Sequence, residues 1–414
     1  MKEKVLVIGS GGREHAIVWK LAQSKCHIFA APGNGGISNF AECIPIKADN
    51  INALLNFVQD NSIDLTIVGP EAPLALGIVD EFQKQHLKIF GPNRRAAQLE
   101  ASKAFAKNFC RKYNLPTANF ETFTDSIRAK KYCEDCQFPI VIKASGLAAG
   151  KGVVIVDNKQ SALQTIEMHL EKKLFGSASE EIVIEEYISG EELSLLALCD
   201  GYKIVPLLPA RDYKKLLDAD HGPNTGGMGS FAPVAKIDQH WIEKFRNELF
   251  TPFIRGLKSE GIEYKGIIYF GLILTNEKFY ILEFNCRWGD PEAEVIIPLL
   301  KTDILSMCYQ TIDENIEELD WLNKFALTVI AASGGYPSEY QVGKLIAGNL
   351  TDTDDVIIFH CGTKKENNNY YTNGGRVLAV TGIGDSLSSA RTKAYQRIQD
   401  IYFDNIYYRK DIGQ

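Results

Sequence analysis

About the first hundred residues alternate short apolar runs with amphipathic stretches, and this alternation limits the possible folds more than any other feature of the sequence. Apolar runs typical of buried strands occupy residues 5–8, 27–31, 64–69 and 88–91. Patterns typical of amphipathic helices occupy residues 14–23, 52–59 and 74–85. Strands that alternate with helices predict a doubly wound parallel sheet, in which ligands bind beyond the carboxyl ends of the strands.

Three of these strands run into turns rich in glycine or proline. The turns occupy residues 9–15, 32–36 and 69–73. Because each follows a parallel strand, we expect all three to line one edge of the sheet. Gly9 and Gly11 begin a dinucleotide-binding pattern, but Glu14 holds the place of its third glycine. No acidic residue ends the second strand, so we do not expect a nicotinamide cofactor.

The backbone of the first turn can nevertheless bind a phosphate group, because the N-terminus of a helix favours an anion. Gly11 and Gly12 would supply N–H groups, and Arg13 would add positive charge. The alternative is a tight turn that requires glycine only for its backbone angles.

A glycine-rich loop between two predicted strands is a second feature that indicates nucleotide binding. Strands over residues 139–144 and 153–156 flank the loop 145–152. Lys151 has no serine or threonine next to it and the loop opens no helix, so this is not a Walker A motif. A strand–loop–strand flap can close over phosphates, which Lys143 can reach as a point charge. A mobile hairpin with solvated lysines is the alternative.

Two weaker features follow this flap. The predicted strand over residues 181–188 ends in Glu185 and Glu186, where backbone groups can meet an adenine edge, and Glu192 can accept from ribose hydroxyls. The loop 222–229 contains four glycines, which let backbone amides approach a small ligand closely. In both places an ordinary solvated surface is the alternative.

A carboxylate and an amide, Glu283 and Asn285, stand two residues apart at the end of an apolar run. In a strand, such side chains point to the same face. Mg²⁺ accepts hard oxygen ligands of this kind and keeps positions open for phosphate oxygens. Arg287 adds a fixed cation for phosphate. The pattern indicates nucleotide chemistry, although a strand that leaves the core into a polar turn is the alternative.

The rest of the sequence predicts two further units. A charged helix over residues 93–113 leads into the second unit, in which a helix over 239–258 precedes paired strands at 266–274 and 278–285. From about residue 325 the pattern changes to a small α+β unit. Its predicted strands occupy residues 325–332, 356–361 and 376–381, and its helix residues 386–401.

Composition argues against several classes of protein. The net charge of −7 argues against a nucleic-acid surface. The sequence contains no run of about eighteen apolar residues, so we expect no membrane span. Nine scattered cysteines suit reduced thiols in a cytoplasm. Cys133 and Cys136 have CxxC spacing without a second pair or a histidine cluster, so we expect neither a zinc nor a redox role.

The order of these features along the chain resembles the ATP-grasp superfamily. Across its whole length the sequence is similar to the phosphoribosylamine–glycine ligase family, also called glycinamide ribonucleotide synthetases. The strongest matches are residues 9–15, 69–71, 146–153, 222–229 and 287–292. The sequence departs from the family's usual residues at Trp288 (Phe or Leu), Glu294 (Gln), Ser145 (Asp) and Tyr213 (His).

The resemblance implies three domains. An N-terminal doubly wound parallel sheet is expected over residues 1–100, an ATP-grasp domain over 101–324 with a mobile lid at about 120–188, and a C-terminal α+β domain over 325–414. The implied activity is ATP-dependent ligation of glycine to 5-phosphoribosylamine through glycyl phosphate, in purine biosynthesis. ATP is then a co-substrate, and Mg²⁺ or Mn²⁺ the cofactor.

The resemblance also implies roles for individual residues. The catalytic group comprises Arg287, Asp290, Lys143 and Asp212. The ATP-binding group comprises Lys103, Lys143, Gly146, Gly150, Lys151, Gly152, Glu185, Glu186, Tyr187, Ile188 and Glu192. The metal ligands are Glu283 and Asn285. The substrate-binding group comprises Gly11, Gly12, Arg13, Asn34, Glu71, Thr225, Gly226, Gly227 and Met228.

The expected partners are small molecules, with no nucleic acid and no membrane, in a cytoplasmic monomer or weak homodimer. One alternative is another ATP-grasp enzyme that uses bicarbonate or formate. A second, from a different class, is a non-catalytic nucleotide-binding or regulatory protein. The loop 222–229 and residues 287–292 argue against the first, and the lysines with the Glu283 and Asn285 pair argue against the second.

Overall fold

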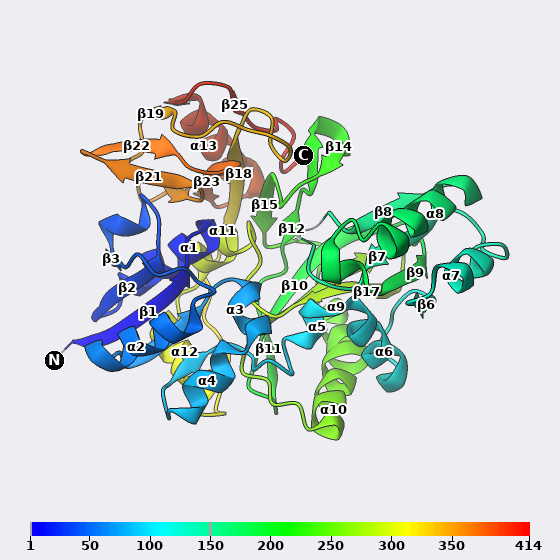
Figure 1. Cartoon of the computed structure of the whole chain (residues 1–414). Helices are drawn as coiled ribbons and strands as arrows, with labels where there is room; N and C mark the ends of the chain where they lie inside the picture. The colour runs from blue at the N-terminus through cyan, green and yellow to red at the C-terminus, as the bar shows by residue number, and fades with distance from the viewer. Residues whose placement is uncertain (1, 149–150) are drawn as a thin grey trace.

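The computed structural model describes residues 2–148 and 151–414. Figure 1 shows the N-terminal sheet in blue, the C-terminal unit in orange and red above it, and a green lobe that projects to the opposite side. The predicted ATP contact at Gly150 lies outside the described residues.

The N-terminal unit is the predicted doubly wound parallel sheet. Its five strands lie in the order β3 (Glu42–Cys43), β2 (Cys26–Pro32), β1 (Glu3–Gly9), β4 (Leu65–Val68) and β5 (Ile89–Phe90). The helices are α1 (Gly12–Leu21), α2 (Ile51–Asn61), α3 (Glu71–Leu76) and α4 (Ile78–Lys84). The single helix predicted over residues 74–85 is wrong, because Gly77 divides it with a left-handed φ of 92°.

The three turns predicted to share one edge of this sheet do so. Gly33 N–H donates to the carbonyl of Gly9 over 3.0 Å, and Gly69 N–H donates to the carbonyl of Ile8 over 3.0 Å. Strand β1 lies between β2 and β4, so the turns after these strands converge beside the start of α1.

The projecting lobe contains a four-stranded antiparallel sheet. Its order is β6 (Phe120–Phe123), β9 (Ile182–Glu186), β7 (Ile140–Ala144) and β8 (Val153–Val156), and its helices are α7 (Ser126–Tyr132) and α8 (Lys159–Ile166). The helix predicted over residues 93–113 is instead two helices, α5 (Gln98–Ala101) and α6 (Lys103–Tyr113). Ser102 separates them and caps α6, since its hydroxyl accepts from Phe105 N–H over 3.1 Å.

A second antiparallel sheet lies between this lobe and the N-terminal unit. Its order is β11 (Ile204–Pro206), β10 (Glu191–Cys199), β16 (Gly266–Leu274) and β17 (Phe279–Asn285). The helix predicted over residues 239–258 is continuous but changes pitch: α9 (Gln239–Phe245) and α10 (Thr251–Glu260) flank a π-helical turn at Arg246–Phe250. All nine residues of β16 are buried, as the continuous apolar sequence of this strand requires.

The C-terminal sheet incorporates strands from the central part of the chain. Its order is β12 (Arg211–Asp212), β15 (Gly229–Ala232), β18 (Phe325–Ser333), β23 (Arg376–Gly384) and β20 (Val356–His360), with β25 (Ile406–Tyr407) also paired to β18. Helix α13 (Leu387–Gln399) packs on β18 and β23. A smaller sheet has the order β21 (Thr363–Glu366), β22 (Asn369–Thr372), β19 (Leu345–Gly348) and β24 (Ile401–Tyr402).

The prediction of a continuous loop over residues 222–229 is only partly right. Residues in its first half form β14 (His221–Asn224), which pairs with β13 (Lys215–Leu217) as a hairpin. Of the four glycines in this segment, only Gly226 and Gly227 lie between β14 and β15. The hairpin therefore fixes the place where the glycine-rich backbone begins.

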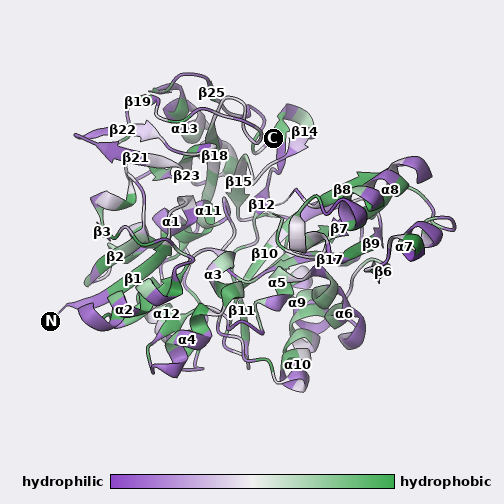
Figure 2. Ribbon diagram, in the orientation of Figure 1, coloured by the Kyte–Doolittle hydropathy of each residue, from purple (hydrophilic) through white to green (hydrophobic). Residues whose placement is uncertain are grey.

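Buried apolar residues join these units into one body. Residues of β1 and α1 pack in the same cluster as α11 (Ala293–Ile296), α12 (Ile304–Ile312) and β18. Hydrophobic residues gather on β10, α10 and α12 (Figure 2). Trp288 lies in this cluster with 2% of its surface exposed. Among the described residues, none of the helices combines the length and the hydropathy needed to cross a membrane.

Candidate active site

Glu283 and Asn285 occupy the end of β17, where the carboxylate faces several cations. Lys214 Nζ lies 3.7 Å from Glu283 Oε1, and Lys143 donates over 3.1 Å to the carbonyl of Leu282. Burial would raise the pKa of Glu283, but the nearby lysines, Lys214 first, outweigh it and lower that pKa. Glu283 is therefore an ionised carboxylate in a positively charged setting.

The predicted phosphate-binding lysines approach this place from separate elements. Lys103 opens α6, and its Nζ donates to the carbonyl of Gly146 over 3.2 Å, which ties the helix to the flap loop. Burial lowers the pKa of Lys103, against the effect of Glu283. Lys151 is exposed on the flap.

Glu185 lies inside the base of the lobe. Its side chain is 3% exposed and forms ion pairs with both Lys107 and Lys143. Its backbone is paired on both sides, with β6 and with β7. Glu185 therefore holds two lysines in place, which differs from its predicted contact with adenine. Glu186 and Tyr187, at the end of β9, are exposed.

Arg287 is held by ion pairs with two carboxylates and by hydrogen bonds to Asn285 and to the carbonyl of Trp288. Its guanidinium lies 2.8 Å from Glu100, 3.5 Å from Glu71, and donates to Asn285 Oδ1 over 3.2 Å. Burial opposes the charge, but Glu100 and Glu71 raise the pKa of Arg287 above its ordinary value. The arginine is thus charged and oriented beside the predicted metal ligand Asn285.

Arg13 pairs with groups of the protein, close to the turn that it was predicted to serve. Its guanidinium is buried, pairs with Glu14 over 2.6 Å and donates to the carbonyl of Trp288 over 3.1 Å. Glu14 also accepts from Gly11 N–H over 2.6 Å, which satisfies one backbone donor at the start of α1. A side chain at Gly69 would overlap Glu14. Glycine at position 69 therefore makes room for the Glu14 carboxylate.

Asn34 uses its whole side-chain amide inside the protein. Its Nδ2 donates to the carbonyls of Ser10 and His360, over 2.9 and 2.7 Å, and its Oδ1 accepts from Gly36 N–H and Ile37 N–H. The amide therefore ties the second turn to the end of β20. This arrangement differs from the predicted contact with a ribose.

The glycine-rich backbone at residues 226 and 227 packs against the turn that contains Asp290. Arg376, from β23, donates to the carbonyl of Gly226 over 2.6 Å and lies 2.9 Å from Asp290 Oδ1. Gly226 N–H donates to Tyr336 Oη over 2.9 Å. The C-terminal unit thus holds two predicted substrate-binding segments together. Met228 next to them is fully buried, and its backbone N–H and carbonyl are bonded to Tyr213 and Ile330.

Asp212 and Lys214 belong to a mixed cluster under the same loop. Lys214 Nζ lies 2.9 Å from Glu192 Oε2. Glu292 accepts from Ser194 Oγ over 2.7 Å. Burial raises the pKa of Asp212, and the carboxylates of Glu292 and Glu192 add to the effect of burial. Asp212 is consequently a carboxyl group that can exchange a proton in the neutral range.

Family profiles match most of the chain in three consecutive segments. They describe phosphoribosylglycinamide synthetase: its N domain over residues 3–100, its ATP-grasp (A) domain over 101–293 and its C domain over 326–414. The chain belongs to the phosphoribosylglycinamide synthetase family.

Individual proteins agree with this membership in the synthetase family. The chain is 46% identical over 414 residues to "Phosphoribosylamine--glycine ligase" of Caldanaerobacter subterraneus subsp. tengcongensis, covering 99% of each protein. It is 44% identical over 423 residues to "Trifunctional purine biosynthetic protein adenosine-3" of Gallus gallus, of which it covers 42%. The crystal structure of phosphoribosylamine–glycine ligase from Thermotoga maritima superposes with a TM-score of 0.88 at 35% identity, covering 99% and 100% of the two chains.

A divalent metal is general for ATP-grasp enzymes, and the donors of this synthetase family member fit one. The described residues contain no group of three or more His, Cys, Asp or Glu side chains that could hold an ion alone. Glu283 and Asn285 instead offer one carboxylate and one amide oxygen. Mg²⁺ is commonly held by one or two carboxylates together with the substrate's phosphates, so this incomplete donor set suits a metal that arrives with ATP.

Several residues of this synthetase site were not found from the sequence. Lys107 and Glu100 lie on predicted helical segments and show no motif. Arg376 is remote in sequence from the loop that it holds. Lys214 lies within the charged run 211–215, two residues after Asp212, and this proximity was the one feature of the sequence that could have indicated its place in the site.

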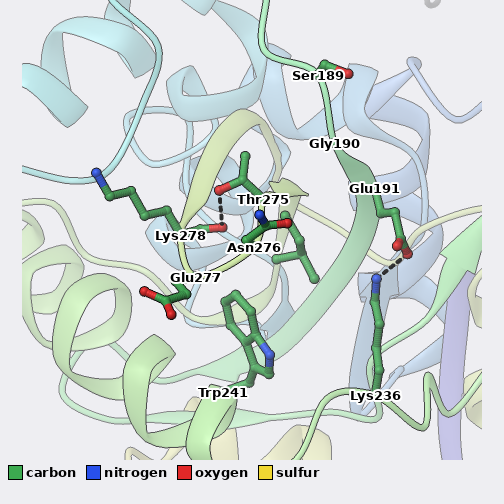
Figure 3. Close-up of a pocket in the computed structure, with 10 residues that line it drawn as sticks. Ser189, Gly190, Glu191, Lys236, Trp241, Thr275, Asn276, Glu277 and Lys278 are labelled. Atoms are coloured by element: carbon green, nitrogen blue, oxygen red, sulfur yellow. Dashed lines mark hydrogen bonds and ion pairs between the residues drawn. The ribbon is translucent and has the colours of Figure 1, made fainter.

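A cavity with a volume of about 870 Å³ lies elsewhere, beside the start of β10. Figure 3 shows Trp241 on one side and the ion pair of Lys236 with Glu191 on another. Glu191 and Glu192 are consecutive in β10 and point to opposite faces. The cavity is therefore on the far side of this strand from the cluster around Lys214.

Proposed function

We propose that this chain ligates glycine to 5-phosphoribosylamine at the expense of ATP, giving glycinamide ribonucleotide, ADP and phosphate for purine biosynthesis. The observation that carries the proposal is that two segments of this chain converge on one site. The end of β17, with Glu283, supplies the nucleotide side. The glycine-rich backbone held by Arg376 against Asp290 supplies the side of the small substrates.

ATP lies, in this proposal, between the lobe and the sheet that contains β17. Lys103, Lys143 and Lys151 neutralise its phosphates, and Gly146 and Gly152 let the flap backbone approach them. Tyr187 and Ile188, beyond the end of β9, meet the base, and Glu192 meets the ribose. Glu283 and Asn285 hold Mg²⁺ or Mn²⁺, which neutralises phosphate charge when it is bound.

The first chemical step requires no side-chain nucleophile, because a carboxylate is already nucleophilic. An oxygen of the glycine carboxylate forms a bond to the γ-phosphorus, and the bond between that phosphorus and the β–γ bridging oxygen breaks to release ADP. Arg287, oriented by Glu100 and Glu71, stabilises the charge that develops on the transferred group. The product of the step is glycyl phosphate.

In the second step the amine of 5-phosphoribosylamine forms a bond to the acyl carbon, and phosphate leaves. The amine must lose a proton, and Asp212, whose pKa burial raises, is the proposed acceptor. The backbone at Gly226 and Gly227 contacts glycine, and a pocket lined by glycine leaves little room for a larger amino acid. Gly11, Gly12 and Glu71 are proposed to contact the phosphoribosyl group.

We propose further that the chain divides at residues 100/101 and 324/325, and that it acts in the cytoplasm as a monomer or weak homodimer. Nine cysteines lie in the described residues, and no two of them form a disulfide. Reduced thiols are the rule in a cytoplasm, which supports this location.

An assay of ADP and phosphate release tests the proposed reaction. Release should require glycine and 5-phosphoribosylamine together, with one ADP formed for each glycinamide ribonucleotide. Omission of either substrate is the control. Release with bicarbonate or formate in place of glycine would contradict the proposal and favour another ATP-grasp activity.

A further inference from the structure

The last residues of the chain lie along the hairpin of β13 and β14, next to the proposed site. Tyr407 Oη donates to the carbonyl of Leu216 over 3.0 Å, and Lys410 N–H donates to Asp218 Oδ1 over 2.8 Å. Gly413 N–H donates to Tyr213 Oη over 3.0 Å. These contacts join segments about 190 to 200 residues apart in the sequence.

Arg409 is the centre of this contact. Its side chain is 0% exposed, although an arginine is rarely buried unless it is fully paired. Its guanidinium binds Asp411 through two hydrogen bonds of 2.8 and 2.6 Å, and Asp220 Oδ1 through one of 2.8 Å. Three of its donor atoms are thus satisfied by carboxylates, a geometry that a planar fork provides and an ammonium does not.

The same guanidinium holds both neighbours of Lys214. It donates to the carbonyl of Lys215 over 3.0 Å, and it lies over the ring of Tyr213 at 5.0 Å from the centroid. Lys214 itself points the other way, toward Glu283. Arg409 therefore grips the backbone from which this cation extends, without approaching the reacting groups.

Two residues at the tip of the hairpin adopt a conformation that side chains disfavour. Ala219 and Asp220 have φ values of 56° and 54°. Ala219 N–H donates to Asp411 Oδ2 over 2.8 Å, so the carboxylate that binds Arg409 also fixes this strained turn. Left-handed residues other than glycine persist where surrounding contacts over-determine them, and they gather near functional sites.

The hairpin passes this restraint to the glycine-rich backbone. Thr225 N–H donates to the carbonyl of Lys214 over 2.7 Å, and Gly227 N–H donates to Thr225 Oγ1 over 3.0 Å. One hydrogen-bonded path therefore leads from Arg409 through Lys215 and Lys214 to Gly227. The proposed phosphate lysines Lys103 and Lys143 lie on other elements, outside this path.

We propose that Arg409 is a positioning residue for the ligase: it sets the place of Lys214 and of the backbone at residues 225–227, and so controls glycine binding and transfer. The inference rests on the proposed function. Arg409 touches neither substrate, and its effect is transmitted through the hairpin. Loss of the guanidinium should harm the use of glycine and leave the binding of ATP nearly unchanged.

The test compares Arg409→Ala, Arg409→Lys and a control, Arg397→Ala, in the full chain. Arg397 lies on α13, and its guanidinium bonds to the carbonyl of Thr351, away from the hairpin. For Arg409→Ala we expect kcat/KM for glycine to fall on the order of tenfold or more, because small misplacement of positioning groups costs rate steeply. KM for ATP should change less than about twofold. Arg397→Ala should match the parent protein.

Chemical rescue separates positioning from general stability. Millimolar guanidinium should restore part of the glycine-dependent rate of Arg409→Ala, and Arg409→Lys should lie between the alanine variant and the parent protein. If Arg409→Ala does not fold, Asp220→Asn provides the second variant, because Asp220 is largely exposed and the neutral amide removes the charge from one arm of the contact. We expect the same split between glycine and ATP, with a smaller amplitude.

Two outcomes would overturn the inference. One is a folded Arg409→Ala, or Asp220→Asn, with the parent kcat/KM for glycine. The other is an equal loss for glycine and ATP that guanidinium does not restore. Glycine-dependent ADP release by the parent protein is measured first: its absence contradicts the proposed function, whereas its presence with unaffected variants contradicts only the role of Arg409.

Discussion

Single side chains in the site balance one another's charge before any ligand binds. Glu185 pairs with Lys107 and Lys143, and Glu100 pairs with Arg287. Glu283 differs, because it is approached by lysines yet stays partly exposed. A carboxylate in that situation can exchange a lysine contact for a metal ion, which is why the metal prediction concentrates on this residue.

Glu283→Ala should reduce turnover by a factor on the order of 10²–10³ or more, because it removes the charge that we expect to hold the metal beside the transferring phosphate. The measurement is kcat for ADP release at saturating Mg²⁺ or Mn²⁺. Glu283→Gln keeps the shape without the charge and should be similarly impaired. Unchanged turnover in the alanine variant would remove Glu283 from the metal site.

Glu294 makes a second prediction, about stability. It is fully buried, and neither carboxyl oxygen has a hydrogen-bond partner within residues 2–148 and 151–414. Burial, reinforced by Asp290, raises its pKa well above the ordinary value. From the unfolded pKa of about 4.3 up to this raised pKa, the folded state binds one more proton than the unfolded state, so stability falls as pH rises.

Glu294→Gln removes this titration and should raise Tm more at about pH 8 than at about pH 5. Thermal unfolding followed by circular dichroism at the two pH values measures the effect. Glu317→Gln, at an exposed position, is the control and should change Tm little at either pH. An equal change at both pH values for Glu294→Gln would show that the buried group takes up no proton on folding.

At the level of whole elements, the loop between β14 and β15 is shaped by its neighbours. Its two glycines lie between the hairpin on one side and the Asp290–Pro291 turn on the other. Gly227 has a φ of 108°, a conformation that other residues rarely adopt, and a Cβ there would overlap Pro291. Backbone and packing therefore both require glycine at this position.

Gly227→Ala should destabilise the fold by about 1–3 kcal/mol and reduce kcat/KM for glycine by roughly tenfold. Gly176→Ala is a matched control, since Gly176 has a φ of 58° but no atom of the described residues lies within 4 Å of a Cβ built there. The control should show the conformational cost without the loss of activity. A Gly227→Ala enzyme with normal use of glycine would show that the loop does not contact this substrate.

The molecule as a whole is organised so that remote segments complete the site. Arg376 and Arg409, from the C-terminal unit, hold the loop and the hairpin. Asn34 ties the N-terminal turns to His360 of the same unit. The site therefore depends on the relative placement of all three parts of the chain.

Asn34→Ala distinguishes this tie from the ribose contact that the sequence suggested. Because several groups would lose their partner, we expect a loss of about 1–3 kcal/mol in stability, seen as a lower Tm, with KM for 5-phosphoribosylamine nearly unchanged. Asn39→Ala should cost less, because the Asn39 side chain bonds half-buried Tyr370 and exposed Lys365 at the same contact. A raised KM without a lower Tm would favour the ribose contact.

The sequence by itself determined the architecture and the elements that carry the candidate nucleotide-binding residues. Period-two and period-3.6 patterns reach only a few residues, and they located the parallel sheet, the flap with Lys143 and the strand with Glu283 correctly. The pairing of Glu283 with Asn285 on one face could be predicted because both residues lie on one strand. The three turns at the sheet edge followed from parallel topology alone.

The tertiary structure alone decided how charged side chains are shared. From the sequence, Arg13 and Asn34 were predicted to bind substrate. In the structure both side chains form hydrogen bonds to other parts of the chain, Arg13 to Trp288 and Asn34 to His360. Arg376 and Arg409 carried no local signal for these roles, because the loop and the hairpin that they hold lie 86 or more residues away in the sequence. Local patterns fix which backbone elements form, but a buried charge must be paired by whatever the fold brings near it, and that pairing is a long-range property.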